Sequence, residues 1–281
     1  MTARRFRQVD VFGTGPLTGN PLAVVVDAVG LDTEGMERIT RWMNLSETTF
    51  LLPPESPGAD YRVRIFTLGG ELPFAGHPTL GTAHVWAALS HHSGTIVQEC
   101  GSGLVPIRPI PGGFSFAAPR LLREGPVDPV FLDQLAAVLG IAVDEIVESR
   151  WVDNGPGWVG LLLSDAERVL SLEPRPEGAG EGIRLDIGVV GPHAAGSEFA
   201  FELRAFFTDD RGQLTEDPVT GSLNASVAQW MIETDRVTTP YLARQGTRLR
   251  REGRVSIDRD EDGTIWVGGA TRTVIEGSIE V

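Results

Sequence analysis

The chain has 281 residues, of which 41% are hydrophobic, and a formal net charge of -14. This length allows two domains, each with its own core, and the acidic balance argues against nucleic-acid or anionic-membrane partners, which need a basic surface. The one cysteine, Cys100, cannot form an intrachain disulfide, and no apolar run reaches membrane-spanning length. We therefore expect a cytoplasmic protein.

The first part of the chain is predicted to form short strands and two helices. Asp32 caps a helix that runs to about Met43, and residues 44–52 lead from it into a strand. A Gly-rich turn followed by an apolar helix occupies residues 69–89. Further strands are predicted at residues 6–12, 21–26, 61–66, 95–99, 104–108 and 114–117.

The second part begins after a Pro-rich crossing at residues 118–128. Its helices are predicted at residues 128–139, 165–172 and 218–233. Its strands are predicted at residues 158–163, 183–190, 198–206, 255–258 and 265–267, with a final strand ending at residue 281 and a polar loop at 173–182.

Two apolar helices, one in each half, must be enclosed because almost every side of them is hydrophobic. We therefore expect an α+β fold of two pseudo-symmetric domains, residues 1–118 and 119–281. Each domain is a curved, mostly antiparallel sheet wrapped around its helix, and the last strand could return to the first domain.

A repeated pattern supports this symmetry. Residues 77–83 (HPTLGTA) match residues 217–223 (DPVTGSL) 140 positions later, and residues 63–66 (VRIF) match residues 203–206 (LRAF) at the same offset. This register predicts that His77 and Asp217 are equivalent. It also predicts that Pro78 and Pro218 are the first residues of their helices, each capped by the preceding residue, with free amides for a carboxylate or phosphate.

The common cofactor and metal motifs are not matched. The glycine-rich turn at residues 13–19 lacks dinucleotide spacing, and the acidic segment at 258–263 lacks the final Glu of a calcium loop. The five histidines form no metal-binding pair at helical spacing. We expect acid and base chemistry without a cofactor or metal.

Three residues are candidates for moving protons: Glu47, His77 and Asp217. Each stands at the end of an element beside a turn. Each also has an ordinary structural interpretation: Asp217 as a helix cap, His77 as a satisfied capping group, and Glu47 as a solvated carboxylate.

At these residues the chain resembles the phenazine-biosynthesis isomerase (PhzF-like) family, which shares its fold with diaminopimelate epimerase. The resemblance rests on blocks spread over most of the chain, at residues 8–12 (QVDVF), 19–24 (GNPLAV), 44–50 (NLSETTF), 64–67 (RIFT), 71–81 (ELPFAGHPTLG) and 216–222 (EDPVTGS).

The resemblance implies that Glu47 is the general acid and base and that His77 and Asp217 are also catalytic. It further implies a homodimer and isomerisation of a small unsaturated cyclic amino acid. Residues implied to contact the substrate are Ser222, Asn20 and the backbone at Gly76 and Gly221.

The related epimerases use two cysteines at the two helix starts, and this chain has neither, so two-thiol racemisation is excluded. We expect Glu47 to take a proton from carbon and return it elsewhere along the conjugated system. Two alternatives stay open: a protein that binds a small carboxylate without turnover, and a lyase or tautomerase that uses the same Glu47.

Overall fold

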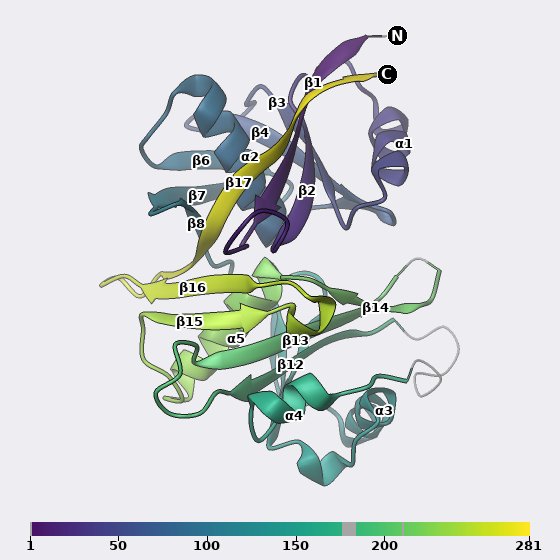
Figure 1. Ribbon diagram of the computed structural model, residues 1–281, viewed down its shortest axis with the longest axis vertical. Coiled ribbons are helices and arrows are strands. Elements are labelled where there is room, and N and C mark those ends of the chain that lie inside the picture. Colours follow the sequence, from purple (N-terminus) through teal and green to yellow (C-terminus); the bar gives the residue numbers. More distant parts are fainter. Residues whose placement is uncertain (1, 176–183, 210) are drawn as a thin grey trace. The chain divides into compact units, whose positions relative to one another are not determined.

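The computed structural model describes residues 2–175, 184–209 and 211–281, so most of the loop predicted at 173–182 and the first residue of the strand predicted at 183–190 lie outside it. Two compact units are present (Figure 1). The first consists of Met1–Ala117, Arg251–Arg254 and Trp266–Val281, and the second of Ala118–Arg250 and Val255–Ile265. The end of the last strand therefore belongs to the first unit.

The first unit is a closed ring of strands around one helix. Its elements are β1 (Ala3–Val11), β2 (Asn20–Val25), α1 (Thr33–Met43), β3 (Thr48–Leu52), β4 (Tyr61–Thr67), β5 (Gly70–Leu72), α2 (Gly76–Ser90), β6 (Ile96–Cys100), β7 (Gly103–Ile110), β8 (Gly113–Ala117) and most of β17 (Ile265–Glu280). β1 pairs with β2, and each later pair follows in turn, β2 with β3, β3 with β4, β4 with β6, β6 with β7 and β7 with β8. β17 then pairs with both β8 and β1, which closes the ring, as its course along β1 shows (Figure 1).

α2 lies inside this ring and packs against β1, β2, β3, β4, β6 and β8. Its first eight residues are all buried, so an apolar helix is enclosed as the sequence predicts. The ring nitrogens of His84 lie 3.1 and 3.0 Å from the hydroxyls of Thr271 and Thr273 on β17, which ties the helix to the last strand. α1 covers the outside of the sheet through Met36 and Ile39.

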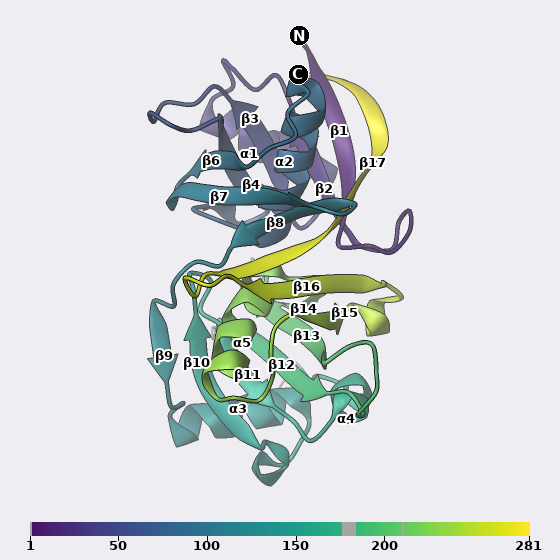
Figure 2. The same cartoon turned by 90° about the vertical axis from the view of Figure 1, so that its left-hand side faces the viewer.

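The second unit also surrounds an apolar helix, α5, which lies among its strands in Figure 2. A Cβ on Gly188 would lie 2.2 Å from Cδ1 of Leu223, so only glycine allows α5 to approach the sheet this closely. α3 and α4 pack on the same core as β11 to β13. The elements are β9 (Arg123–Gly125), α3 (Pro129–Leu139), η1 (Val143–Glu145), β10 (Glu148–Asp153), β11 (Val159–Leu162), α4 (Ala166–Ser171), β12 (Asp186–Pro192), β13 (Phe201–Thr208), β14 (Leu214–Asp217), α5 (Gly221–Glu233), β15 (Tyr241–Gln245), η3 (Thr247–Leu249) and most of β16 (Gly253–Arg259), whose first two residues belong to the first unit.

The two units repeat one order of pairings. An antiparallel pair, β1 and β2 or β10 and β11, is followed by a parallel partner, β3 or β12, and then by an antiparallel one, β4 or β13. A short strand, β5 or β14, precedes the core helix, and a strand parallel to β4 or β13 follows it. This repeated order supports a duplicated fold.

A matching ion pair fixes the register between the repeats. Arg64 holds Glu71 through two hydrogen bonds of 2.7 and 2.6 Å and lies over the ring of Phe66. Arg204 holds Glu216 in the same way, at 3.0 and 2.8 Å, and lies over Phe206. In both hairpins the Glu is the direct cross-strand partner of the Phe.

Several strands were not predicted or have other bounds. The short strands β5, β9 and β14 contain too few residues to show an alternating pattern. In β10, charged residues such as Arg150 and Asp153 obscure the apolar pattern of a strand. The strand predicted at 198–206 is β13, Phe201–Thr208, and the strand predicted at 265–267 continues without a break to residue 280 as β17.

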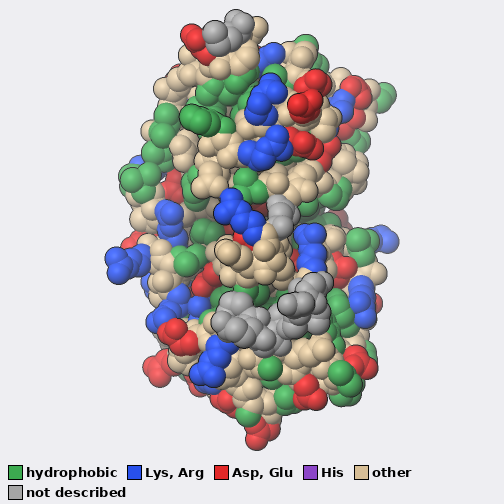
Figure 3. Space-filling model, turned by 90° about the vertical axis from the view of Figure 1, so that its right-hand side faces the viewer, with side chains coloured by type: hydrophobic (Ala, Val, Ile, Leu, Met, Phe, Trp, Pro, Cys, Tyr) green, Lys and Arg blue, Asp and Glu red, His purple; other side chains and the backbone are tan. Residues whose placement is uncertain are grey.

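Among the described residues, no helix is long and apolar enough to span a membrane. On the face drawn in Figure 3, arginine side chains lie beside acidic ones in the first unit. The net negative charge is therefore not gathered into one surface on this face.

Candidate active site

The register of the two helices corrects the sequence prediction. α2 begins at Gly76 and α5 at Gly221, which are 145 positions apart in the numbering instead of 140. The β13–β14 hairpin is five residues longer than the β4–β5 hairpin, because Phe66 pairs with Glu71 and Phe206 with Glu216. The 140-residue match therefore holds for the first strand of each hairpin only.

In the correct register, residues 71–77 (ELPFAGH) align with residues 216–222 (EDPVTGS). His77 is equivalent to Ser222, and each is the second residue of its helix. The predicted equivalence of His77 and Asp217 is wrong: Asp217 pairs with Ala205 as Leu72 pairs with Ile65, so its counterpart is Leu72.

The predicted first helical positions are also wrong. Pro78 is the third residue of α2, and Pro218 lies before α5. The N-caps are Ala75 and Thr220, and neither donates or accepts a side-chain capping bond. Because no side chain fills them, the first-turn amides of both helices are placed to bind an anionic ligand.

Glu47 and His77 meet in the first unit. Nε2 of His77 lies 3.4 Å from Oε2 of Glu47, and the two side chains are 4% and 16% exposed. Burial lowers the pKa of His77 from 6.5 to about 3, so its imidazole is neutral at pH 7. A neutral imidazole with this pKa is a poor base at neutral pH.

Asn20 determines which nitrogen of His77 bears the hydrogen. Its Nδ2 lies 3.3 Å from Nδ1 of His77, and both residues are buried. Because an amide NH₂ can only donate, Nδ1 must accept, and the hydrogen of the neutral ring is on Nε2. The Nε2 hydrogen of His77 thus lies near Oε2 of Glu47, although these two atoms form no hydrogen bond with each other.

In the second unit, Asp217 belongs to a polar cluster at the start of α5. Its Oδ2 accepts a short hydrogen bond from the hydroxyl of Thr220. Buried Gln245 on β15 donates to the Thr220 hydroxyl over 3.0 Å and to the Asp217 carbonyl over 3.2 Å, while its Oε1 accepts from the Thr220 amide over 3.0 Å. Asp217 is therefore held at a fixed place beside the helix start.

Ser222 is held by the loop between β10 and β11. Nε1 of Trp158 donates to its Oγ over 3.0 Å, and Nδ2 of Asn154 donates to its carbonyl oxygen over 2.9 Å. Sequence reasoning missed Trp158, Asn154 and Gln245. In the correct register of the repeat, the β10–β11 loop matches the β1–β2 loop that carries Asn20. Only this match could have indicated the β10–β11 loop from the sequence.

Asp186 was also missed, and the strand register makes it the counterpart of Glu47. Thr48 pairs with Phe66 and Ile187 pairs with Phe206, so Glu47 and Asp186 each precede an equivalent residue. The Asp186 side chain is 11% exposed, and its pKa is raised from 3.8 to about 6. Burial is the main cause; Arg184 opposes the shift, and nearby Asp153 adds to it.

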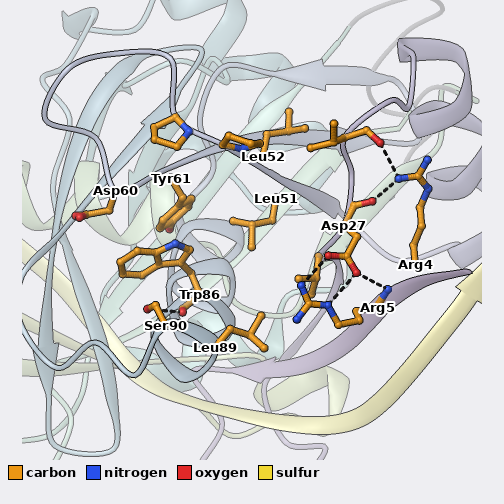
Figure 4. A pocket seen from close by; sticks show the side chains of 14 residues that line it. Arg4, Arg5, Asp27, Leu51, Leu52, Asp60, Tyr61, Trp86, Leu89 and Ser90 are labelled. Atoms are coloured by element: carbon orange, nitrogen blue, oxygen red, sulfur yellow. Dashed lines mark hydrogen bonds and ion pairs between the residues drawn. The ribbon is translucent and has the colours of Figure 1, made fainter.

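A separate pocket of about 590 Å³ lies at another part of the first unit (Figure 4). Tyr61 and Trp86 lie at one end of it, with ring centroids 5.5 Å apart, and Arg5 forms an ion pair with Asp27 at the other. None of Asn20, Glu47 and His77 lines it, so we assign it no part in the site.

Comparison with known structures gives the fold class. A predicted epimerase from Pseudomonas aeruginosa is 28% identical, with a TM-score of 0.81 over 99% of each chain. A hydroxyproline epimerase from Agrobacterium vitis is 11% identical, with a TM-score of 0.61 over 99% of this chain and 92% of that one, a likeness of fold alone. Mixed sheets with few helices place the protein among PhzF-like and proline-racemase-like folds.

Sequence comparison gives the family. Residues 9–277 match the PhzC-PhzF family, described as "Phenazine biosynthesis-like protein". Antisense-enhancing sequence 1 of Schizosaccharomyces pombe is 33% identical over 99% of each chain. The trans-2,3-dihydro-3-hydroxyanthranilate isomerase of Pseudomonas chlororaphis is 57% identical over 85 residues, 30% of this chain and 29% of that one. The chain belongs to the PhzC-PhzF family, which is a family of isomerases.

Proposed function

We propose that the protein is a cofactor-independent isomerase that moves one proton within a small unsaturated cyclic amino or hydroxy carboxylic acid. Trans-2,3-dihydro-3-hydroxyanthranilate is the model substrate, because relatives named as isomerases of this compound share 56–57% identity with part of this chain. The finer fold that goes with this proposal is the two-domain, diaminopimelate-epimerase-like fold, in keeping with the repeated order of strands. A homodimer is proposed on the same family likeness.

The single observation that carries the proposal is the close approach of Glu47, which is partly buried, to buried His77. In the reaction the Glu47 carboxylate takes a proton from a carbon of the substrate, and the electrons of that bond move along the conjugated double bonds. The Glu47 carboxylic acid then returns the proton to another carbon. No electron is gained or lost overall, so the step needs no redox partner.

His77 supports this shuttle as a neutral hydrogen-bond donor. Its Nε2 lies 3.4 Å from Oε2 of Glu47, so a small rotation of either side chain lets the N–H donate to the carboxylate before proton transfer. Because its pKa is about 3, His77 does not compete for the proton at neutral pH. General acid and base groups placed in this way contribute roughly 10²- to 10⁴-fold to a rate.

The remaining predicted residues, except Asn20, are assigned to substrate contact. Each unit has its own donors suited to a carboxylate: the first-turn amides at Gly76 in the first unit, and those at Gly221 with the hydroxyl of Ser222 in the second. Asp217, which accepts from Thr220, is suited to bind a hydroxyl or ammonium group. Asn20 acts through the tautomer of His77.

The proposal is tested by incubating the protein in D₂O with trans-2,3-dihydro-3-hydroxyanthranilate and related unsaturated amino acids, with products followed by NMR. We expect an isomer that carries deuterium at a new carbon. A product that has lost water or another fragment would indicate a lyase. Binding measured by calorimetry with no deuterium uptake would indicate a binding protein, and either result would overturn the proposal.

A further inference from the structure

Trp158 makes a hydrogen bond that fixes how Ser222 can interact with a ligand. The indole Nε1–H donates to Oγ of Ser222 over 3.0 Å, and the two residues are 4% and 8% exposed. An indole N–H is a donor only, so Oγ must be the acceptor in this bond. The hydroxyl hydrogen of Ser222 must therefore point to some other acceptor.

No residue in the described part of the chain accepts that hydrogen. Ser226, one turn later on α5, shows the usual alternative, since its hydroxyl donates back to the Ser222 carbonyl over 2.9 Å. Ser222 makes no such bond to the helix. Together with the first-turn amides of Gly221 and Leu223, its hydroxyl makes the start of α5 a set of donors, which suits an anionic oxygen.

The loop that carries Trp158 is itself held in place. Oδ1 of Asp153 accepts from the amides of Gly155 and Gly157 over 2.7 and 2.8 Å. The two glycines have φ values of 141° and 107°, which residues with a side chain rarely adopt. Asn154 in the same loop bonds the Ser222 carbonyl. Both the backbone and the side chain of Ser222 are thus fixed by one loop.

The first unit uses the equivalent loop for the same purpose. Nδ2 of Asn20, at the end of the β1–β2 loop, faces Nδ1 of His77 at 3.3 Å. His77 and Ser222 are equivalent second residues of α2 and α5. In the first unit, a donor from the β1–β2 loop lies against Nδ1 of His77, and in the second, a donor from the β10–β11 loop bonds Oγ of Ser222. The hydrogen of the His77 ring and that of the Ser222 hydroxyl therefore point away from these donors.

We propose that Trp158 is a positioning residue that directs the Ser222 hydroxyl to donate to the carboxylate of the substrate. The inference rests on the proposed function for the identity of that substrate. It concerns binding of the carboxylate and not the proton transfer by Glu47. Its expected signature is therefore a change in KM with little change in kcat.

The test is Trp158→Phe, which removes the N–H and keeps an aromatic side chain. We expect KM for the carboxylate substrate, and Kd for the stable analogue 3-hydroxyanthranilate, to rise about three- to tenfold, the range of one hydrogen bond. Trp230→Phe is the matched control: its indole is buried in the same unit and donates to Glu148 over 3.1 Å. We expect it to leave both constants unchanged.

A double-mutant cycle separates positioning from packing. If Trp158 acts through Ser222, adding Trp158→Phe to Ser222→Ala should raise Kd no further than Ser222→Ala alone. Effects that multiply fully would overturn the proposal. Equal Kd values for Trp158→Phe, Trp230→Phe and the unmodified protein would overturn it as well.

A spectroscopic readout does not depend on turnover. The indole N–H signal of Trp158, assigned in ¹H–¹⁵N NMR spectra by its loss in Trp158→Phe, should shift on titration with 3-hydroxyanthranilate and shift less with the corresponding carboxamide. An unmoved signal at saturation would contradict the inference. If the protein binds the analogue but isomerises nothing, the proposed function fails while Kd and this signal still decide the role of Trp158.

Discussion

The starts of α2 and α5 occupy equivalent places in the two units but carry different chemistry. At α2, the second helix residue is His77, which faces the carboxyl of Glu47 at 3.4 Å. At α5, the second residue is Ser222, and the carboxyl equivalent to Glu47 is Asp186. Both helices begin without a side-chain cap, and both second residues receive a donor from the preceding hairpin loop.

The comparison shows how the same arrangement of loop and helix start can hold two different side chains, an imidazole and a hydroxyl. The supporting features are the same: Asp10 accepts from the amides of Thr18 and Gly19 in the first loop, as Asp153 does from Gly155 and Gly157 in the second. The second helix residue differs between the units. The imidazole of His77 lies beside a carboxylate of the protein itself, Glu47, whereas the hydroxyl of Ser222 can donate to an anionic oxygen of a ligand. In the proposed function, proton transfer is therefore a role of the first unit and anion binding a role of the second.

The strongest way to break this comparison is Asn20→Asp. An aspartate at this buried position accepts from Nδ1 of His77, which turns its Nε2 lone pair toward Glu47. We expect kcat to fall roughly 10- to 100-fold, the cost of disturbing a group that orients a catalytic side chain, with a smaller change in KM. ¹⁵N NMR of His77 should show hydrogen on Nε2 before the change and on Nδ1 after it.

Gln98→Glu is the control for that prediction. Gln98 is a buried amide whose Nε2 donates to Thr79 on the same helix, α2, over 2.9 Å. Gln98→Glu also replaces a buried amide with a carboxyl but leaves the contact of Asn20 with His77 in place. The loss of kcat should therefore be much smaller than in Asn20→Asp. Equal losses of kcat in the two variants, or hydrogen on Nδ1 in the unmodified protein, would contradict the assigned tautomer.

A smaller effect is expected on stability from Asp186→Asn. Because the pKa of Asp186 rises from 3.8 to about 6 on folding, the unmodified protein loses stability from this group as pH rises through that window. The variant lacks the titration. Between pH 4 and pH 8, the free energy of unfolding of the variant should rise relative to that of the unmodified protein by about 2 kcal/mol, most of the value of the full shift.

Urea unfolding at the two pH values measures this difference. Asp133→Asn, at an exposed position on α3, is a control that should leave the difference near zero. If Asp186→Asn is destabilised more at pH 8 than at pH 4, the Asp186 carboxylate is stabilised by a partner in the folded state, and the comparison with Glu47 must be revised.

The sequence predicted the enclosed helices and most core strands because apolar periodicity is a local signal. Asp32, Asp128 and Asp165 were recognised as helix starts because capping depends on neighbouring residues. The register of the repeat was not predictable in the same way. Pro and Gly recur at an offset of 140 by coincidence, and only cross-strand pairing shows that the second hairpin is five residues longer.

The candidate site was predictable only where short blocks carry it. Glu47, His77 and Asn20 lie in separate blocks that the family resemblance identified, and folding brings them together. Trp158 and Asp186 lie in no such block. Their positions depend on strand pairing and on burial, which the order of residues does not show.

The most direct test of the account is deuterium uptake by Glu47→Gln in D₂O with a substrate that the unmodified protein isomerises. The account predicts that the glutamine variant binds the substrate with similar Kd but exchanges the carbon-bound proton at least about 100-fold more slowly. Uptake at the unmodified rate would contradict the assignment of the proton shuttle to Glu47.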